Sequence, residues 1–304
     1  MTPVLPVTES TLPIETRGLW QDSWDRLRYN RAALVGGSII LAIIVLSLLG
    51  PWLVPLYNGF EYDTLGLENR LANPSWQHPL GTDTLGRDLL ARLLYGSRIS
   101  LMVGVVSTLI SLAIGIAYGA VAGFAGGQVD EVMMRAVDVL YSLPDILLVV
   151  VLMALFERSL LLLLVALGAT SWLTMARIVR GQVLSLKNEQ FIEAARCIGV
   201  SNIGIIVRHI LPNSLGPIIV YATLTVPSVI LAEAFLSFLG LGVPPPASSL
   251  GVLAEEGAEA ISVHPSLAEA DLRPGALSRS PDNGRYATVP APHADDLSGP
   301  VRLA

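Results

Sequence analysis

The sequence predicts an all-α integral membrane protein, built as a polytopic bundle of five membrane-spanning helices. Hydrophobic residues make up 52% of the 304 positions and charged residues only 14%, which is too little charge to cover the surface of a soluble chain of this length. The apolar runs also continue for about twenty residues, which crosses about 30 Å of hydrocarbon, whereas a helix in a soluble core usually stops after about a dozen. Both observations place the chain in a lipid bilayer.

Five apolar runs are long enough to be spans. The first has no small-residue cleavage site and is too long for a signal-peptide core, so we expect it to stay in the protein. The fourth is short and gains length if Arg177 or Arg180 extends toward the interface, while Pro217 and Pro227 predict a kinked or tilted fifth span. The predicted spans cover residues 32–55, 99–124, 132–156, 159–176 and 214–242.

The basic residues predict the orientation, because Lys and Arg concentrate in the cytoplasmic loops of membrane proteins. With the N-terminus inside, ten basic residues lie on the inner side and five on the outer side, so residues 1–31 and 177–213 are predicted to be cytoplasmic. The inner set is Arg17, Arg26, Arg28, Arg31, Arg135, Arg177, Arg180, Lys187, Arg196 and Arg208, and the outer set is Arg70, Arg87, Arg92, Arg98 and Arg158.

The outer loop between the first two spans, residues 56–98, contains a short amphipathic pattern. Thr82 or Asp83 can cap a helix there, with leucines on one side and charged residues elsewhere. This helix either rests at the outer membrane interface or packs against its own protein as a solvated loop helix. The leucines are Leu85, Leu89, Leu93 and Leu94.

Three glycines recur at every fourth position of the second span: Gly115, Gly119 and Gly123. This double G-x-x-x-G pattern removes side chains from one stripe of the helix, so that another helix can approach closely. We interpret the glycines as a helix-packing signal.

Several kinds of active site are excluded by the sequence. Lys187 is the only lysine and does not follow a glycine-rich loop, so no G-x-x-x-x-G-K-[ST] motif holds nucleotide phosphates. The hydrolase and zinc-protease patterns G-x-S-x-G and H-E-x-x-H are also missing. Cys197 is the single cysteine and the four histidines are scattered, so neither a disulfide nor a metal site is predicted. We therefore expect a protein that is not an enzyme, and no basic stripe suggests nucleic acid.

Three carboxylates fall within the apolar runs: Asp138, Asp145 and Glu233. A carboxylate in hydrocarbon is costly and is therefore a candidate for a proton or ion relay, which would make the protein a secondary transporter or channel. The alternative is that each carboxylate forms a hydrogen bond at a helix end or between helices and so fixes packing.

The polar stretch FIEAARCIG, residues 191–199, interrupts the apolar runs on the predicted cytoplasmic side. It belongs to a predicted helix that ends at Gly199 in the left-handed conformation. Ser201 then caps a second predicted helix, which runs to Pro212. The sequence therefore predicts two short helices joined by a sharp turn.

The first of these two helices has the character of a docking element. Ala194 and Ala195 leave one side nearly flat, with Glu193 and Arg196 beside it as charged handles. Such a shape suits insertion into a groove on a partner protein, with the charged pair giving register. The alternative is a helical hairpin that packs on its own bundle.

The spacing of this stretch resembles the EAA loop of ABC-importer permeases, with His209 where the pattern usually has isoleucine. Longer segments look like the C-type permease of dipeptide, oligopeptide, nickel and glutathione importers, over about residues 20–265. Several long motifs in the right order are far more specific than one short pattern. The segments are HPLGTDTLGRDLLARLLYGSRISL (78–101), GGQVDEVMMRAVDVL (126–140), RHILPN (208–213) and EAFLSFLGLGVPPP (233–246).

This resemblance implies a bundle of the type I ABC-importer permease kind and the function of a permease subunit in an ATP-driven importer of dipeptides, oligopeptides or a related small solute. It implies a second permease subunit, two ATP-binding subunits that carry ATP and Mg, and an extracytoplasmic solute-binding protein, in a bacterial or archaeal inner membrane. This chain itself would bind no cofactor. Contact with the ATP-binding subunits would be made by Glu193, Ala194, Ala195, Arg196, Gly199, Leu211 and Pro212.

The resemblance also predicts the domain organisation. The transmembrane permease domain covers 32–265, including a cytoplasmic coupling loop at 181–213. The family would continue with a sixth span, whereas residues 266–304 are rich in Pro, Ser, Asp and Gly and predict a disordered, non-family tail. We hypothesise that a reading-frame change or truncation replaced this span. Such a permease could assemble without transporting, a third interpretation beside the importer and the ion-driven transporter.

Overall fold

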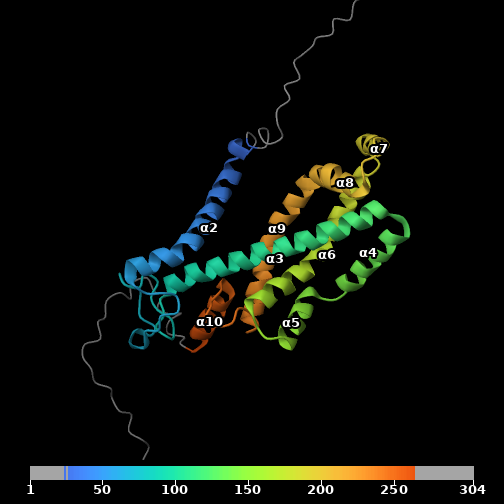
Figure 1. The fold of residues 1–304 in the computed structure, drawn as a ribbon. Helices are drawn as coiled ribbons and strands as arrows, with labels where there is room; N and C mark the ends of the chain where they lie inside the picture. Colours follow the sequence, from blue (N-terminus) through green and yellow to red (C-terminus); the bar gives the residue numbers. More distant parts are fainter. Residues whose placement is uncertain (1–23, 25–26, 264–304) are drawn as a thin grey trace, which may run out of the picture. The chain divides into compact units, whose positions relative to one another are not determined.

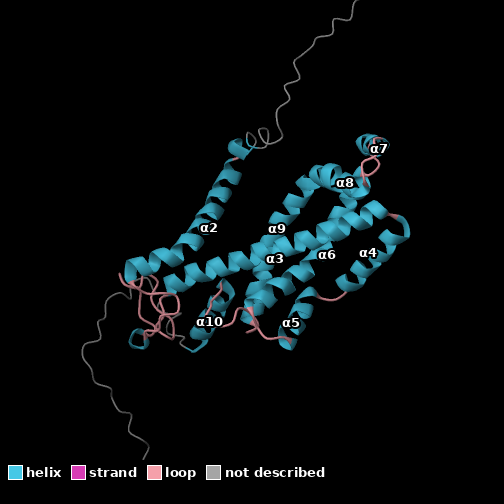
Figure 2. Ribbon diagram, in the orientation of Figure 1, coloured by secondary structure: helices cyan, strands magenta, loops and turns pink. Residues whose placement is uncertain are grey.

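The computed structural model describes Trp24 and residues 27–263, which form helices and loops without a β-strand (Figures 1 and 2). Most of the predicted cytoplasmic segment 1–31 and the whole predicted tail 266–304 lie outside the described residues. Within the described part, the predicted all-α class is confirmed.

Four helices are each long and apolar enough to cross a membrane, and a bent pair of helices makes up to five spans. The four are α2 (Arg31–Asn58), α3 (Leu89–Ala125), α6 (Leu160–Leu186) and the stretch Asn202–Phe238, which ends in α9 (Leu211–Phe238). The bent pair is α4 (Gly127–Tyr141) and α5 (Asp145–Leu155). The shorter elements are η1 (Leu67–Asn69), α7 (Gln190–Cys197), α8 (Asn202–Ile205), the π-helical turn η2 (Ile206–Ile210) and α10 (Leu250–Val263).

The third predicted span is not one straight helix. Its two halves, α4 and α5, are bent by 75° at the break between Tyr141 and Asp145. Pro144 explains the break, since proline has no backbone N–H and disfavours the helical conformation of Leu143 before it. The predicted continuous run 132–156 is therefore corrected to two helices with a short loop between them.

The second span begins earlier than predicted, and the separate amphipathic helix in the outer loop does not exist. Helix α3 starts at Leu89, where the Asp88 carboxylate accepts a hydrogen bond from the Ala91 amide at 2.8 Å. Neither Thr82 nor Asp83 caps it, because the Asp83 carboxylate accepts hydrogen bonds from two amides of its own turn. From Leu89, α3 continues without interruption into the membrane span.

Helices α3 and α6 form the main packing pair of the bundle and lie side by side in Figure 1. The three glycines of α3 lie against α6: a Cβ at Gly115 would lie 2.6 Å from the Met175 side chain, and a Cβ at Gly119 only 2.3 Å from the Ala176 carbonyl oxygen. A Cβ at Gly123 would also come within 2.9 Å of α6. The glycine stripe therefore sets how closely the two helices approach.

The last predicted spans differ from their helices mainly at the ends. Helix α6 runs to Leu186, well beyond the predicted end at 176, and α9 starts earlier and ends earlier than the predicted 214–242. Pro217 and Pro227 both lie inside the continuous helix α9.

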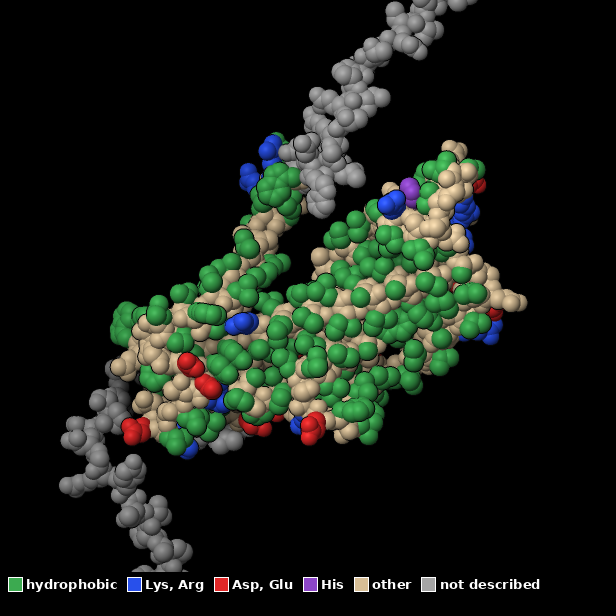
Figure 3. Space-filling view, in the orientation of Figure 1, with side chains coloured by type: hydrophobic (Ala, Val, Ile, Leu, Met, Phe, Trp, Pro, Cys, Tyr) green, Lys and Arg blue, Asp and Glu red, His purple; other side chains and the backbone are tan. Residues whose placement is uncertain are grey.

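Apolar side chains also cover much of the outside of the described bundle. Figure 3 shows them over the long helices, with charged side chains mostly near the helix ends. Helix α2 is the extreme case, since only 6% of its most apolar window is buried. In a membrane protein such a surface faces lipid or another subunit.

Candidate functional site

The stretch 189–205 forms a helical elbow at one end of α6 and α9. We use "elbow" for α7, the turn at Gly199 and α8. Gly199 has a φ of 82°, the left-handed conformation predicted for it, and Ser201 accepts a hydrogen bond from the Gly204 amide at 3.2 Å, which confirms the predicted cap. The first short helix, the sharp turn and the capped start of the second helix are thus confirmed.

The inner face of the elbow is anchored in an apolar cluster. Ile192 and Ala195 of α7 are buried with Ile205 of α8 against Val179 and Val183 of α6. These contacts fix the elbow to the long helix α6, so the elbow is a packed part of the bundle and not a loose loop.

The predicted flat alanine face is wrong. Ala195 points into the cluster and is buried, whereas Ala194 is exposed. Adjacent residues of an α-helix differ by about 100° in direction, so the two cannot share one face. Glu193 and Arg196 are exposed as predicted, and the Arg196 guanidinium lies 5.7 Å from the ring centre of Phe124 at the end of α3.

The outer surface of the elbow carries exposed apolar side chains that sequence reasoning did not single out. Ile198 is 81% exposed and Ile203 is 75% exposed, with Val207 of η2 also exposed. Neither isoleucine lies inside one of the long apolar runs, so the sequence pattern does not mark it. The elbow therefore exposes both apolar and charged side chains.

The far end of the predicted motif has a different structure from that expected. The second helix does not stop at Pro212: α8, η2 and α9 follow one another as a single candidate span. Leu211 and Pro212 form the first turn of α9, where proline is tolerated because the first amides of a helix need no partner. The π-helical turn accommodates the junction.

Glu233 is the one predicted intramembrane acid that is fully buried. Its carboxylate accepts hydrogen bonds from Ser100 of α3 at 3.1 Å and from Ser237 at 2.7 Å. Ser237 lies 3.3 Å from Ser249, and Ser100 accepts a bond from the Leu250 amide at the start of α10. This network joins α3, α9 and α10, which is the packing role weighed against an ion relay.

The other two acids lie on either side of the break between α4 and α5. Asp138 is exposed and accepts a hydrogen bond from Arg177 at 2.7 Å, whose guanidinium also lies 4.2 Å from the ring centre of Tyr141. Asp145 is exposed, and among the described residues its Oδ1 accepts one hydrogen bond, from the neighbouring Ile146 amide at 2.9 Å. The three predicted acids are therefore not brought together into one relay.

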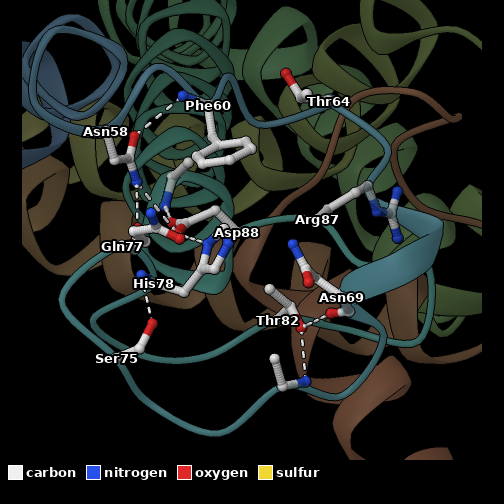
Figure 4. Close-up of polar contacts among 12 residues, drawn as sticks. Asn58, Phe60, Thr64, Asn69, Ser75, Gln77, His78, Thr82, Arg87 and Asp88 are labelled. Atoms are coloured by element: carbon white, nitrogen blue, oxygen red, sulfur yellow. Dashed lines mark hydrogen bonds and ion pairs between the residues drawn. The ribbon is translucent and has the colours of Figure 1, made fainter.

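The outer segment holds a buried polar cluster that sequence reasoning missed (Figure 4). The His78 ring nitrogen Nδ1 lies 2.9 Å from Asp88, which also accepts from Asn58 at 3.3 Å, and the His78 ring packs on Phe60 with 4.7 Å between ring centres. Asn58 donates a second hydrogen bond to the Gln77 carbonyl. Since Asp88 also caps α3, the cluster ties the end of α2 to the start of α3.

A second buried cluster joins the outer turn to α10. Arg92 is 1% exposed and donates to Asp83 at 2.7 Å and to Glu256 of α10 at 2.9 Å. Arg87 donates to the same two carboxylates, at 2.7 Å and 3.3 Å. The cluster holds two guanidinium groups and two carboxylates, so the buried charges of Arg92 and Asp83 are both paired.

The stability that Asp83 contributes is expected to survive to unusually low pH. Burial alone would raise the pKa of the Asp83 carboxyl, but hydrogen bonds from the backbone and side chain of Arg87 and from the Leu85 amide lower that pKa below its ordinary value. Because the folded pKa is below the unfolded one of about 3.9, the contribution is fully present above that pH and is lost only as pH falls through the depressed value.

The unfolding temperature measured against pH tests this expectation. The difference between wild type and Asp83→Asn should be constant from pH 8 down to about pH 5 and should shrink only below about pH 4. A difference that already disappears between pH 7 and pH 5 would contradict the assignment.

Comparisons with known proteins identify the chain. A family profile described as "Binding-protein-dependent transport system inner membrane component" matches residues 115–268, and the profile "N-terminal TM domain of oligopeptide transport permease C" matches residues 18–74. The chain belongs to this permease family. The transport family accounts for its membrane helices without an enzymatic site.

Relatives match over most of the permease. The oligopeptide transport system permease protein OppC of Escherichia coli K12 is 49% identical over 84% of this chain and 84% of its own length. The dipeptide transport system permease protein DppC of Bacillus subtilis is 48% identical over 78% and 73%. The glutathione transport system permease protein GsiD of Shigella dysenteriae is 36% identical over 84% of each. A solved structure of the MetNI methionine ABC transporter covers 58% of this chain and 87% of that chain, at 19% identity and a TM-score of 0.47.

The permease is a multi-pass inner-membrane subunit of an ABC importer, and ATP is hydrolysed by separate subunits of such systems. The family has no cofactor of its own, and it implies a second permease, ATPases and a binding protein in general. The importer interpretation is confirmed, so the ion-driven alternative is set aside.

Proposed function

We propose that this permease subunit imports peptides and that its elbow receives the movement of the ATP-binding subunits. The relatives of 42–49% identity that transport oligopeptides or dipeptides support the substrate class, since the glutathione relatives are only 36–37% identical. The partners would be a second permease subunit, two ATP-binding subunits holding ATP and Mg, and an extracytoplasmic solute-binding protein.

The anchored elbow is the observation that carries the coupling role. Its exposed charges, Glu193 and Arg196, would give register, and Ile198 and Ile203 would supply apolar contact area. Ala194 and Gly199 lie on the exposed side of the elbow, where a bulky side chain would keep an ATP-binding subunit from approaching closely. Leu211 and Pro212 would act at the junction to α9 rather than in the contact itself.

The movement would pass from the elbow into the bundle as a rigid body. Closure of the ATP-binding subunits would pull on α7, and the buried contacts of Ile192 and Ala195 would carry that pull to α6. The permease pair would then switch between inward-facing and outward-facing states. In this proposal the segment 1–31 and the loop 181–213, which contains the elbow, lie in the cytoplasm. The permease domain would cover 32–265.

Native Cys197, which is exposed on α7, allows a direct test. A photo-crosslinker attached to it in the assembled transporter is expected to capture an ATP-binding subunit. The control carries Cys197→Ser and Asn73→Cys, which moves the probe to the outer loop and should capture none. Capture of lipid or of this chain alone from position 197 would overturn the coupling role.

Charge reversal at the elbow gives the matching functional result. Glu193→Arg is expected to weaken co-purification of the ATP-binding subunits at least about tenfold, because a reversed charge in an interface repels its former partner. Glu157→Arg, the same change at an exposed glutamate after α5, should leave co-purification unchanged. Equal behaviour of the two variants would contradict the proposal.

A further inference from the structure

A cavity of about 490 Å³ opens where the third span breaks. It is lined by the ends of α4 and α5 and by the middle parts of α6 and α9. Its volume is within the range of cavities that hold small molecules, about 300–1,000 Å³. None of the buried clusters described above uses this space.

Non-helical backbone within the third span borders this cavity. Backbone between Tyr141 and Asp145 leaves the helical hydrogen-bonding pattern, and at membrane depth this is tolerated where the segment is buried in protein or lines a water-filled space. Broken helices in transporters commonly surround a binding site for the same reason. The break therefore marks this cavity as a candidate binding site.

Asp145 is the only Asp, Glu, Lys or Arg among the described residues that line this cavity. Its Oδ1 accepts a hydrogen bond from the Ile146 amide, and no other hydrogen bond to this carboxylate is formed within the described part of the chain. Asp138 and Glu233, in contrast, are both engaged with side chains of other helices. A carboxylate with free acceptor capacity inside a span is a functional candidate.

The remaining lining suits a peptide end with a positive charge. Trp172 and Tyr221 border the cavity, and aromatic faces attract ammonium groups. The third aromatic side chain of the lining, Tyr141, already has the Arg177 guanidinium 4.2 Å from its ring centre. Thr225 and Ser228 of α9 add hydroxyls that can bond peptide carbonyls and amides.

We propose that this cavity is a transit site for the peptide substrate, in which the Asp145 carboxylate binds the protonated α-amino group. The inference rests on the proposed function, because it specifies how the imported peptide is recognised within the permease. A smaller apolar cavity of about 80 Å³, lined in part by Ile146, Val149 and Leu236, also borders Asp145. It places apolar side chains beside the bound amine, where the first side chain of a peptide would lie.

The test uses the complete transporter with its binding protein in proteoliposomes, supplied with tri-alanine or N-acetyl-tri-alanine. Asp145→Asn is expected to lower uptake of the free-amine peptide roughly tenfold, as expected for loss of a charge-assisted hydrogen bond, while Asp145→Glu retains it. The ratio of free-amine to acetylated uptake should fall toward one in Asp145→Asn. One binding protein delivers both peptides to every variant, so its own preference cancels when variants are compared.

ATP hydrolysis stimulated by the loaded binding protein is measured in parallel and should stay near wild type in Asp145→Asn. Glu131→Gln, an exposed acid on α4 outside the cavity, is the matched control and should change neither ratio nor rate. An unchanged ratio in Asp145→Asn, with tri-alanine still imported by wild type, overturns the transit site and leaves the proposed function standing. Absence of peptide uptake by wild type overturns both.

Discussion

Replacing Gly119 by leucine is expected to prevent α3 and α6 from packing and to leave little folded permease. Any Cβ at this position would lie 2.3 Å from the carbonyl oxygen of Ala176, which is backbone and cannot rotate away. Overpacking a core usually costs about 1–3 kcal/mol, and the cost should be higher here because a whole helix must shift. The measurement is the fraction of monodisperse protein after extraction into detergent, together with its unfolding temperature.

Gly181 provides the matched control for this change. It lies on α6, the helix that α3 packs against, but nothing lies within 4 Å of a Cβ built at that position. Gly181→Leu should therefore be extracted and should unfold like wild type. If Gly119→Leu behaved the same way, the glycine stripe would have no role in the close approach of the two helices.

Arg92→Met is expected to be the most damaging change in the outer segment. It leaves the buried carboxylate of Asp83 without one of its two guanidinium partners and removes the direct link from α3 to Glu256. Removing one partner of a buried ion pair typically costs about 3–5 kcal/mol. We expect a cost toward the lower end, because Arg87 remains and Glu256 is about a third exposed. Denaturant unfolding in micelles measures this loss.

An exposed arginine tests whether burial causes the effect. Arg135 pairs with Glu131 on α4, and both side chains are mostly exposed. Arg135→Met should cost less than about 0.5 kcal/mol, as is usual for exposed helix pairs. A double change of Arg92→Met with Glu256→Gln should recover part of the loss, since it removes a carboxylate that would keep only the 3.3 Å contact with Arg87. Without such recovery, the loss would come from packing of the arginine stem instead.

The outer segment and the break in the third span show where sequence reasoning failed. The spacing of Leu85 and Leu89 suggested one helix, but Asp83 closes a local turn and α3 starts only after Asp88. Pro144 breaks the helix, yet the apolar residues on both sides predict a single span. In both places a short hydrogen-bonding or steric constraint outweighed the hydrophobic pattern.

The sequence alone determined the features that depend on neighbouring residues. Long apolar runs specify spans because each helix satisfies its own backbone hydrogen bonds, and Gly199 and Ser201 specify the elbow because a left-handed turn and a cap are local events. Only the tertiary structure decided which distant groups meet. Arg92 and Glu256 are 164 residues apart in sequence, Ser100 and Glu233 are 133 apart, and the cavity at Asp145 needs four helices. Such contacts depend on how helices pack, and helical periodicity does not specify the partner of each face.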